Sequence, residues 1–220
     1  MQKPLFIFDF DGTLADTKDV IVEIGNRYAA EVGADPISDG DMEVYREEGV
    51  LALMKKRGLS AIDLVRILKR GSEMFAERSG SVKLVGDIDG VIRKFGESGV
   101  MIAVVTSNTE ESVKKALGGL AGYFSGIFPE KDLFGKAAKL KRVVKAMKAE
   151  PRNSFYVGDE PRDMAAAVKA GIHPIGVSWG FGSERSLIAS GAERIARSPE
   201  ELVRMVDNSS FSERGHRCYN

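Results

Sequence analysis

Residues 5–14 of the chain read LFIFDFDGTL and combine an apolar run with two closely spaced acids. The apolar run from Leu5 to Phe8 predicts a fully buried β-strand. The strand ends on Asp9 and Asp11, whose spacing of two residues can direct both carboxylates to the same side of the edge of a sheet. Two acids this close repel one another, so they cost stability unless a divalent cation or a shared proton relieves the repulsion. Taken alone, the pair fits an acidic turn equally well.

The composition is that of an ordinary globular protein and excludes several classes of function. The chain has 220 residues and carries 32 basic and 32 acidic side chains, which leaves no basic excess to indicate a nucleic-acid partner. Its one cysteine, Cys218, cannot form a disulfide within the chain, so we expect a reducing, cytoplasmic location. We expect no signal peptide and no membrane span, because no stretch approaches the roughly 20 apolar residues that a span needs. A monomer or a homodimer is expected.

Beyond residue 82, predicted strands alternate with predicted helices. Further strands are expected at 100–105, 126–128, 154–157 and 174–177, with a short one near 195. Helices are expected at 88–97, around 113–117, and at 137–148, 161–170 and 199–206. Alternation of this kind predicts an α/β fold, in which a parallel sheet of Rossmann-like type is covered by helices on both faces.

Residues 9–99 separate the first two predicted strands, whereas a strand–helix–strand crossover needs only about 30 residues in total. The intervening pattern is helical. We expect one helix over 18–32, one from Ser38, one from a capping box at 60–63 that buries Ile62, Val65 and Leu68, and a shorter one over 72–78. Residues 15–82 are therefore predicted to form an inserted helical cap over the Asp9/Asp11 loop. Residues 1–14 and 83–220 would form the α/β core, with a loose polar tail from Asn208.

Polar side chains gather at the predicted carboxyl ends of the core strands, where parallel α/β sheets bind their ligands. They come from four separate segments: Asp9 and Asp11; Thr106, Ser107 and Asn108; Lys136; Asp159 and Asp163.

Each residue type in this set has a use in phosphoryl transfer. One carboxylate can attack phosphorus, and a second can protonate the leaving alkoxide and later accept a proton from water. Mg²⁺ prefers hard oxygen ligands and needs only a few protein carboxylates. A hydroxyl, an amide side chain and backbone N–H groups can hold phosphoryl oxygens, and a lysine can steady both the nucleophile and the transferring group.

These segments match, in order, four motifs of the haloacid dehalogenase-like (HAD) superfamily, and the chain resembles its phosphoglycolate phosphatase-like branch with a helical cap. The resemblance implies that Asp9 is the nucleophile and that Asp11 is the general acid and base, both also binding metal. It implies that Thr106, with Ser107 and Asn108, binds phosphate. Asp159 and Asp163 would hold Mg²⁺, and Lys136 would pair with Asp9 and the phosphoryl group. Lys131, Lys139 and Lys141 lie nearby; Lys136 is preferred because it follows Gly135 at the start of a helix.

The predicted function is Mg²⁺-dependent hydrolysis of a small phosphorylated metabolite, either phosphoglycolate-like or a sugar phosphate, through an aspartyl-phosphate. Superfamily members that cleave carbon–halogen bonds lack the second aspartate, so Asp11 favours phosphoryl transfer. A phosphomutase or a phosphonate hydrolase with the same core remains open, the latter requiring a cap lysine such as Lys55, Lys56 or Lys69. A phospho-accepting signalling module is an alternative of a different class. The cap sets the substrate, and its basic residues could either reach an anionic group or form a solvated face.

Overall fold

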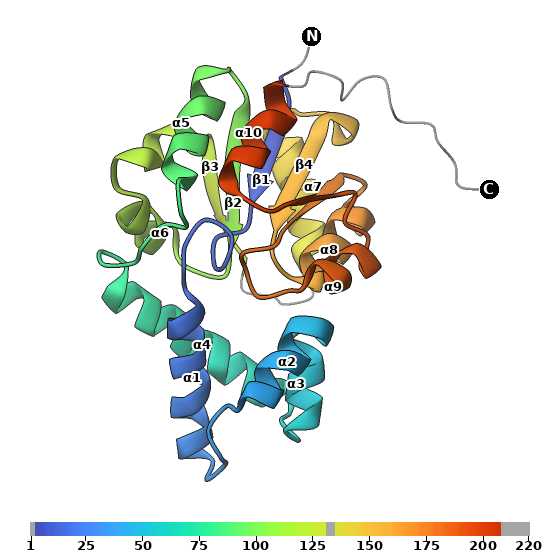
Figure 1. Cartoon of the computed structure of the whole chain (residues 1–220). Helices are drawn as coiled ribbons and strands as arrows, with labels where there is room; N and C mark the ends of the chain where they lie inside the picture. Colours follow the sequence, from blue (N-terminus) through green and yellow to red (C-terminus); the bar gives the residue numbers. More distant parts are fainter. Residues whose placement is uncertain (1–2, 131–134, 208–220) are drawn as a thin grey trace, which may run out of the picture.

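The computed structural model describes residues 3–130 and 135–207 (Figure 1). Its centre is a six-stranded sheet in which every neighbouring pair is parallel, in the order β3-β2-β1-β4-β5-β6. The strands are β1 (Leu5–Phe8), β2 (Met101–Thr106), β3 (Gly126–Pro129), β4 (Ser154–Gly158), β5 (His173–Val177) and β6 (Arg194–Ala196). The predicted α/β fold with a parallel sheet is confirmed.

Helices cover both faces of this sheet because alternate residues of the buried strands point to opposite sides. Phe6 and Phe8 pack with side chains of α5 (Ile88–Glu97), α6 (Glu110–Leu117) and α10 (Pro199–Asp207). Leu5 and Ile7 pack with α7 (Lys136–Ala146) and α8 (Pro161–Ala170) on the other face. All four side chains are fully buried, and each contributes about 1.5–3 kcal/mol. Residues 5–8 therefore contribute to the hydrophobic core on both faces of the sheet.

Four helices form a separate group below the sheet in the view of Figure 1, and we call them the helical unit. They are α1 (Lys18–Glu31), α2 (Asp39–Glu48), α3 (Val50–Lys56) and α4 (Ala61–Arg78). The chain leaves the core and returns to it at one place, where Ala15 forms a β-bridge with Leu84. The unit meets the core again through α2, whose Arg46 carbonyl accepts hydrogen bonds from Ser183 N and Ser186 Oγ.

Two expectations for the last helix of this unit are wrong. The predicted helix over 72–78 is not separate, because α4 continues through Gly71 without a break. A Cβ at Gly71 would lie 3.3 Å from Ile24 Cδ1, so the glycine lets α1 and α4 approach closely. The predicted inward stripe is also wrong: Ile62 and Val65 are 64% and 65% exposed.

Other differences are smaller. The α3 helix was not predicted as a separate element, and it is divided from α2 by Gly49 at φ +85°. The short helix α9 (Glu184–Ala189) was not predicted, although Ser183 caps it. None of the described helices combines the length and the apolarity needed to cross a bilayer. The predicted tail from Asn208 lies outside the described residues.

A capping box fixes the start of α4 and ties it to α1. Asp63 Oδ2 accepts from Ser60 N at 2.7 Å, and Asp63 Oδ1 accepts from the Tyr28 hydroxyl. The Ser60 side chain and then the Tyr28 hydroxyl lower the pKa of Asp63 from 3.8 to about 2. Because the folded-state pKa is depressed, the ionised carboxylate stabilises the fold above pH 3.8, and this contribution is lost as pH falls through about 2.

We therefore expect Asp63→Asn to destabilise the protein at pH 6 but progressively less towards pH 2, since a protonated aspartic acid resembles asparagine. Urea unfolding of both proteins at four pH values measures this difference. Asp39→Asn, on the exposed start of α2, is the matched control and should show no such convergence. A gap between wild type and Asp63→Asn that stays constant with pH would contradict the assignment.

Candidate active site

The site lies where the strand order reverses, between β1 and β4. Asp9 follows β1 directly, and its N–H donates to the Val157 carbonyl of β4 at 2.8 Å. Asp159 follows β4 directly. Both side chains are buried, Asp159 completely. The order of the strands thus brings together two carboxylates that are 150 residues apart in the chain.

Asp159 is held rigidly by the two loops that flank it. Its Oδ1 accepts from Thr13 Oγ1 at 3.0 Å, and its Oδ2 accepts from the Phe181 N–H at 2.8 Å. Gly12, at φ +73°, and Gly180 lie so close that a Cβ on either would come within 2.4 Å of an Asp159 atom. Glycine is required at both positions because the backbone packs directly against the carboxylate.

Lys136 joins the remaining acids. It is the first residue of α7, and its Nζ lies 2.6 Å from Asp163 Oδ1 and 3.3 Å from Asp9 Oδ1. Asp163 Oδ2 accepts from Glu160 N at 3.1 Å, which caps α8. Lys139 makes neither contact, and Lys131 lies outside the described residues. Of the candidate lysines that the structure describes, Lys136 is the one placed at the site.

Burial and mutual repulsion make the carboxylates reluctant to ionise without a counter-charge. Desolvation raises the pKa of Asp9 to about 7; Lys136 opposes this shift and Asp163 adds to it. Burial and the neighbouring acids Glu160, Asp163 and Asp9 raise the pKa of Asp159 well above its ordinary value. Burial works against the charge of Lys136, but Asp163 and Asp9 outweigh it and raise the pKa of the ammonium. A bound cation would therefore stabilise the ionised form of these carboxylates.

One carboxylate oxygen from each of Asp9, Asp159 and Asp163 lies within 4.8 Å of the other two. This arrangement of hard carboxylate oxygens at the edge of the sheet fits Mg²⁺, which takes a few carboxylates and completes its octahedron with waters and phosphate oxygens. The donor set therefore suits the cation that the sequence implies.

Asp11 occupies a different environment from Asp9. It is half-buried and its Oδ2 accepts from Asn108 Nδ2 at 2.7 Å. Burial raises the pKa of Asp11 to about 6, against hydrogen bonds from Thr17 and Asn108 that lower it. Asn108 is positioned in turn by its N–H, which donates to Thr106 Oγ1 at 3.0 Å. Asp9 and Asp11 therefore have different side-chain partners, Lys136 and Asn108, although they are only two residues apart.

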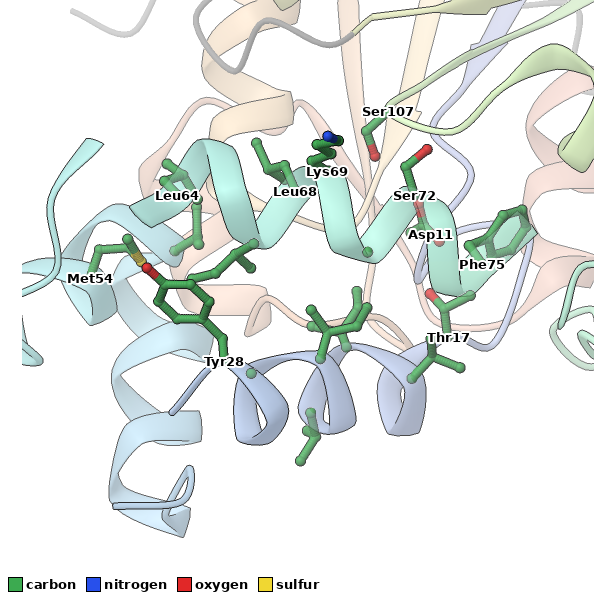
Figure 2. A pocket seen from close by; sticks show the side chains of 18 of the residues that line it. Asp11, Thr17, Tyr28, Met54, Leu64, Leu68, Lys69, Ser72, Phe75 and Ser107 are labelled. Atoms are coloured by element: carbon green, nitrogen blue, oxygen red, sulfur yellow. The ribbon is translucent and has the colours of Figure 1, made fainter. Parts of the chain in front are cut away.

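Ser107 is exposed, and it faces the same cavity as Asp11 and Thr17 (Figure 2). Each of the eight residues predicted for the site lies in this region, either in the acid and lysine cluster or in the turn after β2: Asp9, Asp11, Thr106, Ser107, Asn108, Lys136, Asp159 and Asp163.

The sequence did not reveal a buried network between the helical unit and the core. The Arg162 guanidinium binds both oxygens of Glu160, at 2.7 and 2.8 Å, and the Tyr45 hydroxyl of α2 donates to Glu160 Oε1 at 3.0 Å. The Tyr45 ring also lies 5.2 Å from that of Phe181. The alternating glycines at 180 and 182 were the available signal that the loop after β5 packs against the site; nothing in the sequence pairs Tyr45 with Glu160.

A family model described as "haloacid dehalogenase-like hydrolase" matches residues 6–177, which include every element of the site. The chain is a haloacid dehalogenase-like hydrolase. The resemblance inferred from the four motifs is confirmed, as is the expectation of an enzyme.

The hydrolase is similar to two curated phosphoglycolate phosphatases. The protein of Synechococcus elongatus is 28% identical over 91% of this chain and 95% of its own length. That of Aquifex aeolicus is 26% identical over 93% of this chain and 97% of its own. The crystal structure of a predicted phosphatase from Clostridium acetobutylicum aligns with 94% of the hydrolase over 99% of its own chain, with a TM-score of 0.79 at 21% identity. This last likeness shows the fold.

Proposed function

We propose that this hydrolase is a Mg²⁺-dependent phosphatase that cleaves a small phosphomonoester through an aspartyl-phosphate on Asp9. The observation that carries the proposal is the division between two neighbouring carboxylates. Asp9 faces Lys136 and the acid cluster, whereas Asp11 is held apart by Asn108. The phosphoglycolate phosphatase relatives support the same reaction.

In the first half-reaction an Asp9 oxygen attacks phosphorus, and the bond from phosphorus to the ester oxygen breaks. The Asp11 carboxylic acid gives its proton to the departing alkoxide, a role suited by a pKa raised to about 6. In the second half-reaction Asp11 takes a proton from water, which attacks phosphorus and releases inorganic phosphate, restoring the Asp9 carboxylate. Asp11 thereby ends protonated, ready for the next cycle.

The remaining residues position the phosphoryl group and balance its charge. Lys136 lies against Asp9 and supplies a fixed positive charge where negative charge develops. Thr106, Ser107 and Asn108, at the end of β2 and before α6, would hold phosphoryl oxygens. Mg²⁺ bound by Asp9, the Asp11 carbonyl, Asp159 and Asp163 would supply electrostatic stabilisation of the transferring phosphoryl group.

The helices α1–α4 are proposed to act as the cap, with the bounds 15–82 expected from the sequence. They meet the core at the buried Tyr45–Glu160 contact and cover the cavity that Asp11 lines. A phosphonate hydrolase is disfavoured, because its Schiff-base lysine has to be desolvated. Of the three candidates, only Lys69 lines the cavity, and its side chain is 79% exposed.

A panel of phosphomonoesters scored by kcat/KM for phosphate release tests the proposal. It includes 2-phosphoglycolate and glucose 6-phosphate. Release is expected with Mg²⁺, a loss of at least about 10²-fold after chelation, and full recovery on adding Mg²⁺ back. Activity that survives chelation would contradict the metal dependence. A phosphorylated protein that forms but persists for hours would instead indicate a phospho-accepting module.

A further inference from the structure

A cavity of about 570 Å³ runs from the proposed catalytic residues into the helical unit (Figure 2). Asp11, Thr17 and Ser107 lie at one end of the labelled lining. Tyr28 and Met54 lie at the other, with α4 passing along the cavity between the two ends. Cavities of about 300–1,000 Å³ are the size of small-molecule sites. This cavity, which we call the chamber, is far larger than the two-carbon portion of phosphoglycolate requires.

The chamber is apolar away from the catalytic end. Its lining comes from α1, α2, α3, α4 and the loops between them, and consists mainly of aliphatic side chains: Val20, Ile21, Ile24, Ile37, Met42, Val50, Leu53, Met54, Leu59, Leu64, Ile67 and Leu68. The hydroxyl of Tyr28 is already engaged by Asp63. Apolar walls of this kind favour hydrocarbon over water.

The helical unit does not fill this space with its own side chains. Among the described residues, α1–α4 contribute only Phe75 to the two clusters of buried apolar residues that flank the sheet, whereas their other buried apolar side chains, such as Ile24, Met54 and Leu64, lie around the chamber. Protein interiors normally pack as densely as organic crystals, because unfilled space forfeits dispersion contacts. Among the described residues, α1 and α4 pack closely where Ile24 meets Gly71, and beside that contact their apolar side chains line the chamber.

Among the residues that the structure describes, the cations lining the chamber are paired with acids or exposed to solvent. Of the described basic residues in the lining, Arg57 binds Asp41, Arg162 binds Glu160, and Lys136 binds the catalytic acids. Lys69 is solvent-exposed at the rim. Carboxylate or sugar oxygens placed against the aliphatic part of the lining would lose hydrogen bonds to water, which is costly.

We propose that the substrate is a phosphomonoester of an apolar alcohol, with its phosphate at Asp9 and its hydrocarbon chain in the chamber. This inference rests on the phosphatase function proposed above and specifies its substrate class. It differs from the phosphoglycolate and sugar phosphates that the sequence resemblance suggests, because most of the lining that α1–α4 contribute to the chamber is aliphatic.

A series of n-alkyl phosphates from ethyl to octyl, kept below micelle-forming concentrations, measures the use of the chamber. Burial of each methylene is expected to raise kcat/KM about three- to fourfold until the chamber is full. An ester of the same length as octyl phosphate, in which ether oxygens replace every third carbon, controls for length and should lose most of this gain.

Leu68→Trp, which fills the chamber, should lower the ratio of octyl to ethyl phosphate in kcat/KM at least tenfold. Ile62→Trp is the matched control on the exposed side of the same helix and should leave the ratio unchanged. Leu68→Gln adds a polar group without bulk and should also lower the ratio, so the test survives if the tryptophan variant fails to fold.

A flat chain-length series, or a preference for 2-phosphoglycolate over octyl phosphate, would overturn the inference while leaving the phosphatase function intact. If no ester is hydrolysed, the phosphatase function fails instead. The chamber is then tested by calorimetry with ethyl- and octylphosphonate on the wild-type protein. Tighter binding of the octyl compound, weakened by Leu68→Gln, would support the chamber, and equal binding would refute it.

Discussion

Asp9→Asn is expected to lower kcat/KM for phosphate release by at least roughly 10⁴-fold, as is usual when a covalent nucleophile is removed. The amide has the same shape as the carboxylate but cannot attack phosphorus. The fold should be retained. Burial raises the pKa of Asp9 to about 7, so the ionised form, not the neutral one, is disfavoured in the folded protein. Stability from this group is present at low pH and lost as pH rises through about 7. At pH 8 without metal, the variant should therefore melt no lower than wild type.

Phosphate release, circular dichroism and thermal melting of the two proteins check this expectation together. Asp16→Asn provides the matched control, because Asp16 is an exposed aspartate just beyond the same loop. It should retain wild-type activity. Magnesium-dependent hydrolysis that persists in Asp9→Asn would exclude the aspartyl-phosphate.

Much of the core could be predicted because its signals are local. Each central strand is an apolar run too short for a helix, and a polar residue or a glycine marks its end, as with Asp9 after β1 and Gly158 in β4. The α8 helix starts at Pro161 and ends before Gly171, which adopts the left-handed conformation of a C-terminal cap. These features fix the bounds of an element whatever surrounds it.

The helical unit was predicted less well because its surroundings decide which faces are buried. Ile62 and Val65 have helical spacing with Leu68, but the face that packs on the rest of the molecule carries Leu64, Met74 and Phe75. A glycine within a helical pattern also predicts a break, because the sequence does not show whether a neighbouring helix packs closely against it, as Ile24 packs against Gly71. Long-range packing of this kind is not visible in the sequence of one segment.

The same distinction between local signals and long-range packing applies to the candidate site. The strand ends of a parallel sheet meet at one edge, so the sequence alone is enough to predict that Asp9 and Asp159 lie together. The Tyr45–Glu160 contact depends on how α2 docks on the core, and the chamber depends on what α1 and α4 leave unfilled. Neither follows from a motif, which is why the substrate class could not be predicted from the sequence.

Asp11→Asn is expected to affect alkyl and p-nitrophenyl phosphates differently. An alkoxide needs a proton in order to leave, so kcat for alkyl esters should fall about 10²–10⁴-fold, the usual contribution of a general acid. Nitrophenolate leaves without a proton, so the first half-reaction on p-nitrophenyl phosphate should stay fast. Asn108 donates its amide N–H to Asp11 Oδ2 in the wild type, and an asparagine that turns its carbonyl oxygen to Asn108 keeps that bond, which limits structural change.

The second half-reaction also needs Asp11, because the same side chain takes a proton from the attacking water. Asp11→Asn with p-nitrophenyl phosphate should therefore release about one nitrophenolate per active site in a rapid burst, followed by slow turnover as the aspartyl-phosphate on Asp9 accumulates. Rapid-quench measurement of nitrophenolate and of acid-stable phosphoprotein follows both quantities, with Asp16→Asn as the control that shows neither change. Equal losses on both esters without a burst would mean that Asp11 positions the site and does not transfer protons. The burst would instead assign both proton transfers to one carboxylate, as expected for a group whose pKa burial has raised to about 6.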